Sequence, residues 1–182
     1  MTLKEYIKKM EGNGTSPGGV TFSEIIWSGI GSFIGIGLCG YLTKDYFDPL
    51  SLTLIIGSFG ASAVLVYGAI KSPLAQPRNL LGGHILSGIV GVACFNLLGH
   101  FSLPVAAAAA VSIAIMLMHA TRTLHPPGGA TALIAVIGGK GIHNLGYLYA
   151  LIPAGLGALV LLIVALLVNN LAMHRKYPEY WW

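Results

Sequence analysis

The fold is decided by the stretch Thr121-Arg122-Thr123-Leu124-His125-Pro126-Pro127-Gly128-Gly129-Ala130-Thr131. Tandem prolines cannot continue a helix, although proline fits the first turn of one. The residue before a proline, here His125, is pushed out of helical geometry. We therefore predict that one helix stops near Leu124 and that the next begins near Pro127 or Gly128.

Apolar runs fill the chain on both sides of this break. Of the 182 residues, 55% are hydrophobic and only 9% are charged, whereas a soluble domain carries about 25% charged residues. A spanning helix needs about 20 mostly apolar residues. The runs are Phe22–Leu42, Leu50–Ile70, Leu80–Gly99, Pro104–Ala120, Gly128–Gly138 and Tyr147–Ala172. This pattern predicts an all-α integral membrane protein with about six hydrophobic segments.

The run Gly128–Gly138 is too short to cross a bilayer alone. It crosses if Thr121–Pro127 lies at membrane depth, and otherwise it is re-entrant. The other five runs are long enough, or nearly so. A model with four crossings and re-entrant pieces places both ends of the chain on one side, as a model with six crossings does.

Domain limits and orientation follow from the charges. We expect an N-terminal cytoplasmic segment over 1–21, a transmembrane domain over 22–172 and a short cytoplasmic aromatic tail over 173–182. With six crossings, the inside segments hold Lys4, Lys8, Lys9, Lys71, Arg78, Arg122, Arg175 and Lys176, against Lys44 and Lys140 outside. This bias fits the positive-inside rule and a multi-pass protein of the plasma membrane. Tyr177, Tyr180, Trp181 and Trp182 resemble an interfacial anchor.

Two short pieces of the chain match each other. Gly60–Leu65 resembles Gly129–Ile134 at a spacing of 69 residues. The match suggests two three-segment halves, over 22–99 and 104–172, in opposite orientations and with broken or half helices. Inverted repeats of this kind bind substrate near the midplane, at the repeat interface. The alternative is that glycine and alanine recur because small residues let membrane helices pack closely.

Acidic residues are absent between Pro49 and Pro178. Hard metal ions prefer carboxylates, proton relays in membranes commonly use Asp or Glu, and paired-carboxylate catalysis needs two acids. The core therefore lacks the groups for these functions, and we expect no metal, no cofactor and no enzymatic activity. Its fixed charge is positive, which suits anions. The alternative is that the basic residues only mark the cytoplasmic edge.

A candidate anion site lies near the midplane, where the N-termini of two half helices, one from each half of the chain, would face one point; one of them is the helix after the proline pair. A helix N-terminus offers free N–H groups and partial positive charge, and arginine adds a planar fork of donors. The candidate substrate-binding residues are Arg122, His125, Gly128, Gly129, Ala130 and Thr131, joined from the other half by Gly60, Ala61 and Ser62. The structural alternatives are an edge role for Arg122, a capping role for His125 and packing roles for the glycines.

A third feature is the proline-containing stretch Ser72–Asn79, which predicts an ordered loop. Gln76, Arg78 and Asn79 are candidates for closing one mouth of a path, although a turn with cytoplasmic charges explains them equally. His84 lies within an apolar run, where polar groups are costly and often functional. It either belongs to the path or ties two helices together.

The stretch Leu124–Ala132 resembles the signature of the HPP family of integral membrane proteins, named for its His-Pro-Pro. Ser58–Ala63 and Ser72–Asn79 resemble the other two characteristic stretches of that family, and Gly82-Gly83-His84 follows as expected. The resemblance covers about residues 20–172. It implies the four transmembrane segments usually described for the family. Through similar proteins of chloroplasts and cyanobacteria, it also implies transport of nitrite or a similar small anion.

Three functions remain open on the sequence. The first is a carrier or channel for a small inorganic anion, with the lipid bilayer as its other partner and no role for nucleic acid. The second is a membrane assembly domain without transport, whose small-residue faces serve a homo-oligomer. The third is an intramembrane enzyme acting on a lipid phosphate. The sequence argues against this third function because no Ser or Thr nucleophile is paired with a clear base.

Overall fold

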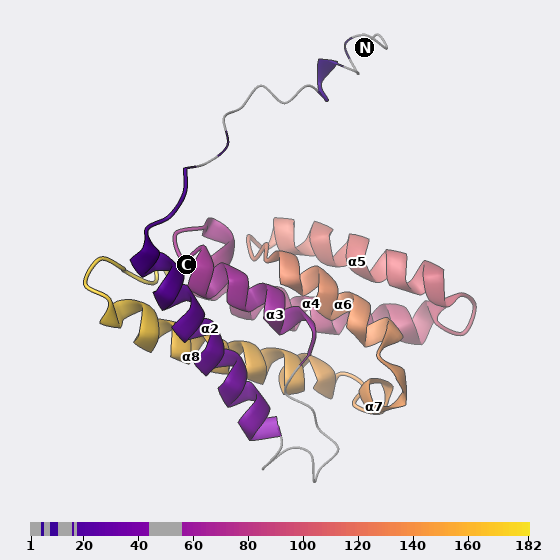
Figure 1. Cartoon of the computed structure of the whole chain (residues 1–182). Coiled ribbons are helices and arrows are strands. Elements are labelled where there is room, and N and C mark those ends of the chain that lie inside the picture. The colour runs from indigo at the N-terminus through magenta and orange to yellow at the C-terminus, as the bar shows by residue number, and fades with distance from the viewer. Residues whose placement is uncertain (1–4, 6–7, 11–15, 17, 44–55) are drawn as a thin grey trace.

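The computed structural model describes residues 5, 8–10, 16, 18–43 and 56–182, and its regular structure there is helical (Figure 1). In chain order the helices are α2 (Phe22–Leu42), α3 (Ser58–Ala63), α4 (Pro77–Leu98), α5 (Leu103–Ala120), α6 (Pro126–Ile137), α7 (Gly139–His143) and α8 (Leu156–Leu171). Three other helical turns join them, namely the π-helical η3 (Val64–Gly68) and η5 (Ala150–Gly155) and the 3-10 turn η4 (Pro73–Ala75).

Four helical segments of the described chain are long and apolar enough to cross a membrane. They are α2, α4, α5 and the segment Ala150–Leu171 formed by η5 and α8, which is kinked at Ile152, where φ is −135° and ψ 116°. Two apolar helices are shorter, Ser58–Gly68 and Pro126–Ile137. At about 1.5 Å per residue they extend roughly 16–18 Å, near half of a hydrocarbon core of about 30 Å.

The short helices are the ones that carry the motifs of the sequence. The expectation for Gly128–Gly138 is confirmed, because α6 has only 12 residues. The expectation that Leu50–Ile70 is long enough to cross is wrong for its described part, since the helix there begins only at Ser58. Residues 50–55 of that run lie outside the described residues.

The break at the proline pair is confirmed. Helix α5 ends at Ala120, His125 has extended backbone angles of φ −139° and ψ 104°, and α6 begins at Pro126. Between the two helices Arg122 takes a left-handed conformation with φ of 57°, which an arginine rarely adopts. The chain therefore reverses sharply here, and α6 returns beside α5 (Figure 1).

Helix α4 lies at the centre of the bundle, and glycines set how closely its neighbours approach. A Cβ atom on Gly91 would lie 2.5 Å from the Ala132 carbonyl oxygen, and one on Gly128 would lie 2.9 Å from the Gly83 carbonyl oxygen. Both neighbours are backbone atoms of the facing helix, so neither can move aside cheaply. The packing of α4 on α6 thus depends on backbone-to-backbone contact.

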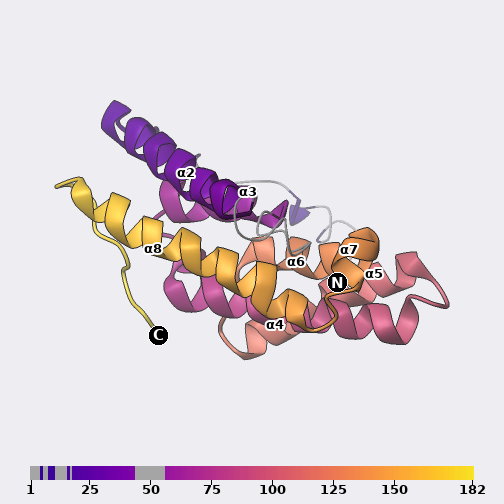
Figure 2. The same cartoon turned by 90° about the horizontal axis from the view of Figure 1, so that it is seen from below.

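Tyr67 fills the space between α2 and α8. Its ring lies against Gly31 and Gly35 of α2, where an added Cβ would come within 2.7 Å and 2.1 Å of tyrosine atoms. Its hydroxyl donates a hydrogen bond to the Leu161 carbonyl at 3.0 Å. Helices α2 and α8 lie side by side (Figure 2). The end of the bundle at which α2 begins and α8 ends is called the tail end below.

Candidate functional site

The short helices α3 and α6 lie side by side and run in opposite directions. Ser62 Oγ lies 2.9 Å from His125 Nε2 at the start of α6, whereas Ser58 Oγ lies 2.9 Å from Thr131 Oγ1 further along α6. Residue numbers thus fall along α3, from 62 to 58, in the direction in which they rise along α6, from 125 to 131, and the two helices are therefore antiparallel. Both motifs of the sequence meet at this contact.

Between the short helices lies a cluster of two imidazoles and three hydroxyls. It contains Ser58, Ser62, His84, His125 and Thr131 and is called the imidazole–hydroxyl cluster. Ser62 Oγ lies 2.7 Å from His84 Nε2, and His84 Nδ1 lies 2.7 Å from Thr131 Oγ1. All five side chains are 1% exposed or less. The polar atoms thus satisfy one another within an apolar interior, as buried polar groups must.

Backbone groups hold this cluster from outside. His125 Nδ1 donates to the Leu74 carbonyl at 2.8 Å, and the Tyr149 hydroxyl donates to the Thr131 carbonyl at 2.9 Å. The two imidazole rings lie 5.1 Å apart at an interplanar angle of 61°. A Cβ on Gly83 would lie 2.5 Å from His125 Cβ, so only glycine leaves room for this ring. Both rings are therefore fixed in orientation.

The cluster gathers only part of the candidate anion site. His125, Thr131 and Ser62 come together, and His84, assigned from the sequence to the path, joins them. Gly60, Ala61 and Arg122 are exposed, and Gly129 and Ala130 are half-buried. Gly128 is buried, but it packs against α4 at the Gly83 carbonyl. Ser58 was missed, although it stands four residues before Ser62, one helical turn away.

Two of the three candidate gate residues, Gln76 and Asn79, hold the loop before α4 in place. Gln76 is fully buried, and its Nε2 donates to the carbonyls of Ile70 at 3.0 Å and Ser72 at 2.8 Å. Asn79 Nδ2 donates to the Leu124 carbonyl at 2.8 Å, which ties this loop to the turn before His125. Asn79 Oδ1 and Arg78 Nε are buried without a hydrogen-bond partner. Because α4 starts at Pro77, Arg78 and Asn79 lie in its first turn rather than in a loop.

The C-terminal residues fold back onto that same loop, which the sequence did not indicate. The Tyr177 hydroxyl donates to the Ala75 carbonyl at 2.7 Å, and the Glu179 N–H donates to Gln76 Oε1 at 2.9 Å. Tyr177 is only 2% exposed, and burial raises the pKa of its hydroxyl, which therefore stays protonated and able to donate. The interpretation of Tyr177 as a membrane anchor is wrong, since protein rather than lipid surrounds it.

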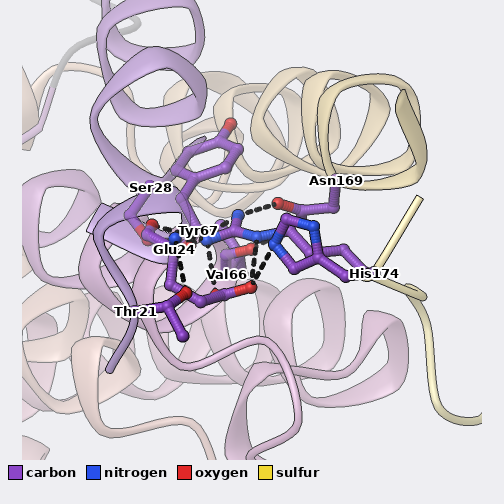
Figure 3. A network of polar contacts seen from close by, with 8 residues as sticks. Thr21, Glu24, Ser28, Val66, Tyr67, Asn169 and His174 are labelled. Atoms are coloured by element: carbon purple, nitrogen blue, oxygen red, sulfur yellow. Dashed lines mark hydrogen bonds and ion pairs between the residues drawn. The ribbon is translucent and has the colours of Figure 1, made fainter. Parts of the chain in front are cut away.

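A second polar network lies at the tail end, where Glu24, Ser28, Tyr67 and Asn169 gather (Figure 3). Arg175 is bonded to all four of these residues. Its guanidinium donates to the Glu24 carboxylate from Nε at 3.1 Å and Nη2 at 2.7 Å. Further hydrogen bonds reach the Glu24 carbonyl, Ser28 Oγ, the Tyr67 carbonyl and Asn169 Oδ1. The network joins α2, η3 and α8. Sequence reasoning placed Arg175 only as an edge charge, because nothing local marks a partner 151 residues away.

An open cleft of about 530 Å³ lies beside this network. Its lining includes Lys71, Ser72 and His174 as well as Glu24 and Arg175. Ser72 Oγ accepts a hydrogen bond from the Leu74 N–H at 3.2 Å, and the Leu74 carbonyl accepts from His125. Ser72, in the lining of the cleft, is thus two residues along the chain from Leu74, whose carbonyl accepts the hydrogen bond of His125.

The helices and the buried polar cluster define a polytopic helical membrane protein whose two short helices carry its motifs. The chain belongs to the HPP transmembrane family, because the family model "HPP, transmembrane region" matches residues 17–178. This confirms the resemblance found in the sequence.

Two transmembrane proteins of Dictyostelium discoideum are similar to this chain. One is 46% identical over 180 residues, which are 98% of this chain and 58% of the relative. The other is 45% identical over 188 residues, covering 100% of this chain and 65% of the relative. The chain therefore spans less than two thirds of each relative's length. No solved structure matches it.

Proposed function

We propose that this protein transports a small inorganic anion, with nitrite as the first candidate, along a path through the imidazole–hydroxyl cluster. The observation that carries the proposal is the meeting of two short motif-bearing helices at buried donors, in a part of the sequence without Asp or Glu. Imidazole N–H groups and hydroxyls donate to anions, and no carboxylate repels an anion there. The nitrite assignment rests on the family resemblance.

The cluster is closed in this structure, so an anion has to displace internal contacts. Ser62 Oγ stands between both imidazoles, at 2.7 Å and 2.9 Å, and it is the contact that an anion oxygen replaces with least rearrangement. Helix α6 contributes the partial positive charge of its N-terminus beside His125. The start of α3 lies beside Thr131 instead, and so a pair of facing helix starts is not part of the proposal.

The tail-end cleft is the proposed mouth of the path. Lys71 lines it beside the Glu24 carboxylate, which pairs with Arg175 and His174, and Arg122 is exposed between α5 and α6. We place this end in the cytoplasm at the plasma membrane, by the positive-inside rule. The inverted repeat stays part of the proposal. It is supported by the opposed directions of α3 and α6. In the order of the chain, each of these short helices comes after one long helix and before another.

An intramembrane hydrolase is the second candidate, and one observation favours it. Ser62 Oγ is 2.7 Å from His84 Nε2, a spacing typical of a serine nucleophile and its base. The sequence-based statement that no Ser or Thr is paired with a base is therefore wrong. Against this candidate, His84 Nδ1 meets the Thr131 hydroxyl rather than a carboxylate, and Ser62 is fully buried. For the assembly-domain alternative, Gly83, Gly91 and Gly128 are not available as an interface, because they pack inside the chain.

The test is anion flux into liposomes that contain the purified protein. Nitrite uptake is compared with nitrate and chloride uptake, and protein-free liposomes give the background. Ser62→Ala removes the hydroxyl between the imidazoles and should abolish nitrite flux. Ser112→Ala is the matched control, since Ser112 bonds only its own helix backbone at Ala108 and Ala109 and is exposed. Absence of flux for all three anions from folded protein refutes the proposal.

A further inference from the structure

An apolar groove runs along α4 beside the C-terminal residues. Its first part has a volume of about 340 Å³ and is lined by the start of α4 together with Trp181 and Trp182. Its second part, of about 400 Å³, is lined by α4 and by the segment formed by η5 and α8. Leu81 and Ile85, one helical turn apart on α4, line both parts. The two parts are therefore continuous, and together they are called the α4 groove.

The α4 groove has an aliphatic body and one cationic end. Its second part is lined by leucines, isoleucines and one glycine. The charged residue in the lining of the first part is Arg78, which lies in the first turn of α4. From Arg78 to Ile85 the helix rises by about 10 Å, which is within the roughly 15 Å that one leaflet contributes to a hydrocarbon core. The groove is thus shaped for a molecule with an apolar chain and an acceptor at its head.

Arg78 lacks an ion-pair partner among the described residues. Its Nε is buried without a hydrogen bond, and the ion pairs of the described chain join Glu24 to His174 and Arg175 instead. The other described arginines and lysines, apart from the fully bonded Arg175, are exposed. A guanidinium withdrawn from water without an acceptor is unfavourable. Because Arg78 as a whole is only half-buried, an acceptor from outside the protein can reach it.

The tryptophans indicate the depth of this end in the membrane. Trp181 is 50% exposed and Trp182 is 83% exposed, although both line the groove. Tryptophan is enriched where the bilayer meets water, since its ring is apolar and its N–H is a donor. Arg78 also lies at the start of a helix long enough to span the membrane. The cationic end is therefore expected at the level of the lipid headgroups, with the aliphatic body among the acyl chains.

We propose that the α4 groove binds an anionic membrane phospholipid, with one acyl chain along the aliphatic body and the phosphate bonded to Arg78. A guanidinium presents a planar fork of donors that matches two phosphate oxygens. No carboxylate lines either part of the groove, and Glu179, the acid nearest in sequence to the tryptophans, forms no ion pair with Arg78. The cationic head of a zwitterionic lipid thus finds no counter-charge there, and an anionic headgroup is preferred.

Native mass spectrometry of the full chain, purified in detergent, measures this preference. Dioleoyl phosphatidylglycerol and dioleoyl phosphatidylcholine have the same acyl chains and differ in headgroup charge. The wild type should retain one phosphatidylglycerol with a preference of about tenfold, the size expected for one charge-assisted hydrogen bond. Arg78→Gln should remove the preference. Lys140→Gln makes the same change in net charge at an exposed residue outside the groove and should keep it.

A second variant tests the aliphatic body of the groove. Leu159 lines the second part and is 40% exposed, so an indole introduced by Leu159→Trp takes the space of the acyl chain. Binding of both lipids should fall by the same factor, while the remaining binding still favours phosphatidylglycerol. The melting temperature of each variant without added lipid shows whether a loss of binding is a loss of fold.

Four results overturn the proposal. They are equal retention of the two lipids by the wild type, a preference that survives in folded Arg78→Gln, a preference that falls as far in Lys140→Gln, and unchanged binding in folded Leu159→Trp. A wild-type dimer that Leu159→Trp dissociates would instead assign the groove to a second copy of the chain. None of these measurements involves anion flux, so the transport proposal is tested separately.

Discussion

Arg175 and Glu24, 151 residues apart, form a two-point ion pair in which Nε and Nη2 donate to separate carboxylate oxygens at 3.1 Å and 2.7 Å. The Arg175 side chain is fully buried and makes six hydrogen bonds in all. It connects the first long helix with the segment after the last one. The network closes the bundle at the tail end, beside the cleft proposed as its mouth.

Replacing Arg175 with lysine should destabilise the fold, because an ammonium group has three donors and no planar fork. We expect a loss of about 2–3 kcal/mol, in the range for buried pairs and unpaired polar groups. The loss is measured as a fall in melting temperature in detergent, with size-exclusion chromatography as the probe of unfolding. Lys176→Met removes an exposed neighbouring charge and should leave the melting temperature unchanged. Equal melting temperatures for Arg175→Lys and wild type would show that the network adds no stability.

Gly91→Ala and Gly60→Ala should differ sharply. The new methyl on Gly91 would meet the Ala132 backbone at 2.5 Å, and such overpacking costs about 1–3 kcal/mol. A methyl on Gly60 meets no atom within 4 Å. The substitution should therefore leave the free energy of unfolding unchanged or raise it by up to about 1 kcal/mol, because alanine has the higher helix propensity. Nitrite flux should also survive Gly60→Ala. If it does not, Gly60 returns to the anion site as the sequence predicted.

Ser62 should not react with a fluorophosphonate probe. A serine hydrolase exposes its nucleophile to substrate, whereas Ser62 Oγ is fully buried between two imidazoles. The measurement is mass spectrometry of the intact protein after exposure to an alkyl fluorophosphonate in detergent. Labelling that disappears in Ser62→Ala would favour the hydrolase over the transporter.

Arg122→Gly should weaken the apparent affinity for the anion without abolishing flux. Arg122 is exposed at φ 57°, a conformation that glycine adopts without strain, so the fold should be unharmed or slightly stabilised. An exposed charge attracts anions over a distance that salt screens, and the difference from wild type should therefore shrink as ionic strength rises. Flux kinetics at low and high potassium gluconate test this. A complete loss of flux at both salt concentrations would place Arg122 in the binding site itself.

Removing the Tyr177 hydroxyl should loosen the loop that holds His125. Tyr177→Phe leaves the Ala75 carbonyl without its 2.7 Å hydrogen bond, at a cost of about 1–2 kcal/mol. The neighbouring Leu74 carbonyl is the partner of His125, so hydrogen exchange at residues 72–76 should rise. Tyr180→Phe, which removes a longer bond of 3.2 Å to Pro73 from an exposed side chain, should have a smaller effect. Equal exchange in wild type and Tyr177→Phe would exclude a holding role for the tail.

Local chemistry explains what the sequence predicted well. The stop before His125 and the restart at Pro126 follow from the backbone limits of proline, and the long helices follow from the length of their apolar runs. Ser62, His125 and Thr131 could be found because they lie within recognisable motifs. Their mutual contacts could not be predicted, because they depend on the antiparallel placement of α3 against α6.

What the sequence missed depends on contacts between distant residues. Tyr177 reads as an interfacial aromatic residue until its carbonyl partner at Ala75 is known. Gly60 and Gly91 look alike in the sequence, yet one faces open space and the other a backbone carbonyl. His84 carried a signal, a polar side chain in an apolar run, but not the identity of its hydroxyl partners.

The pairing of Glu24 with Arg175 has a consequence for biosynthesis. A polypeptide grows from its N-terminus, so Glu24 on the first long helix meets this partner only after residue 175 has been made. The tail end of the bundle therefore closes only once α8 has been synthesised, and the order of synthesis makes this network one of the last parts of the fold to form.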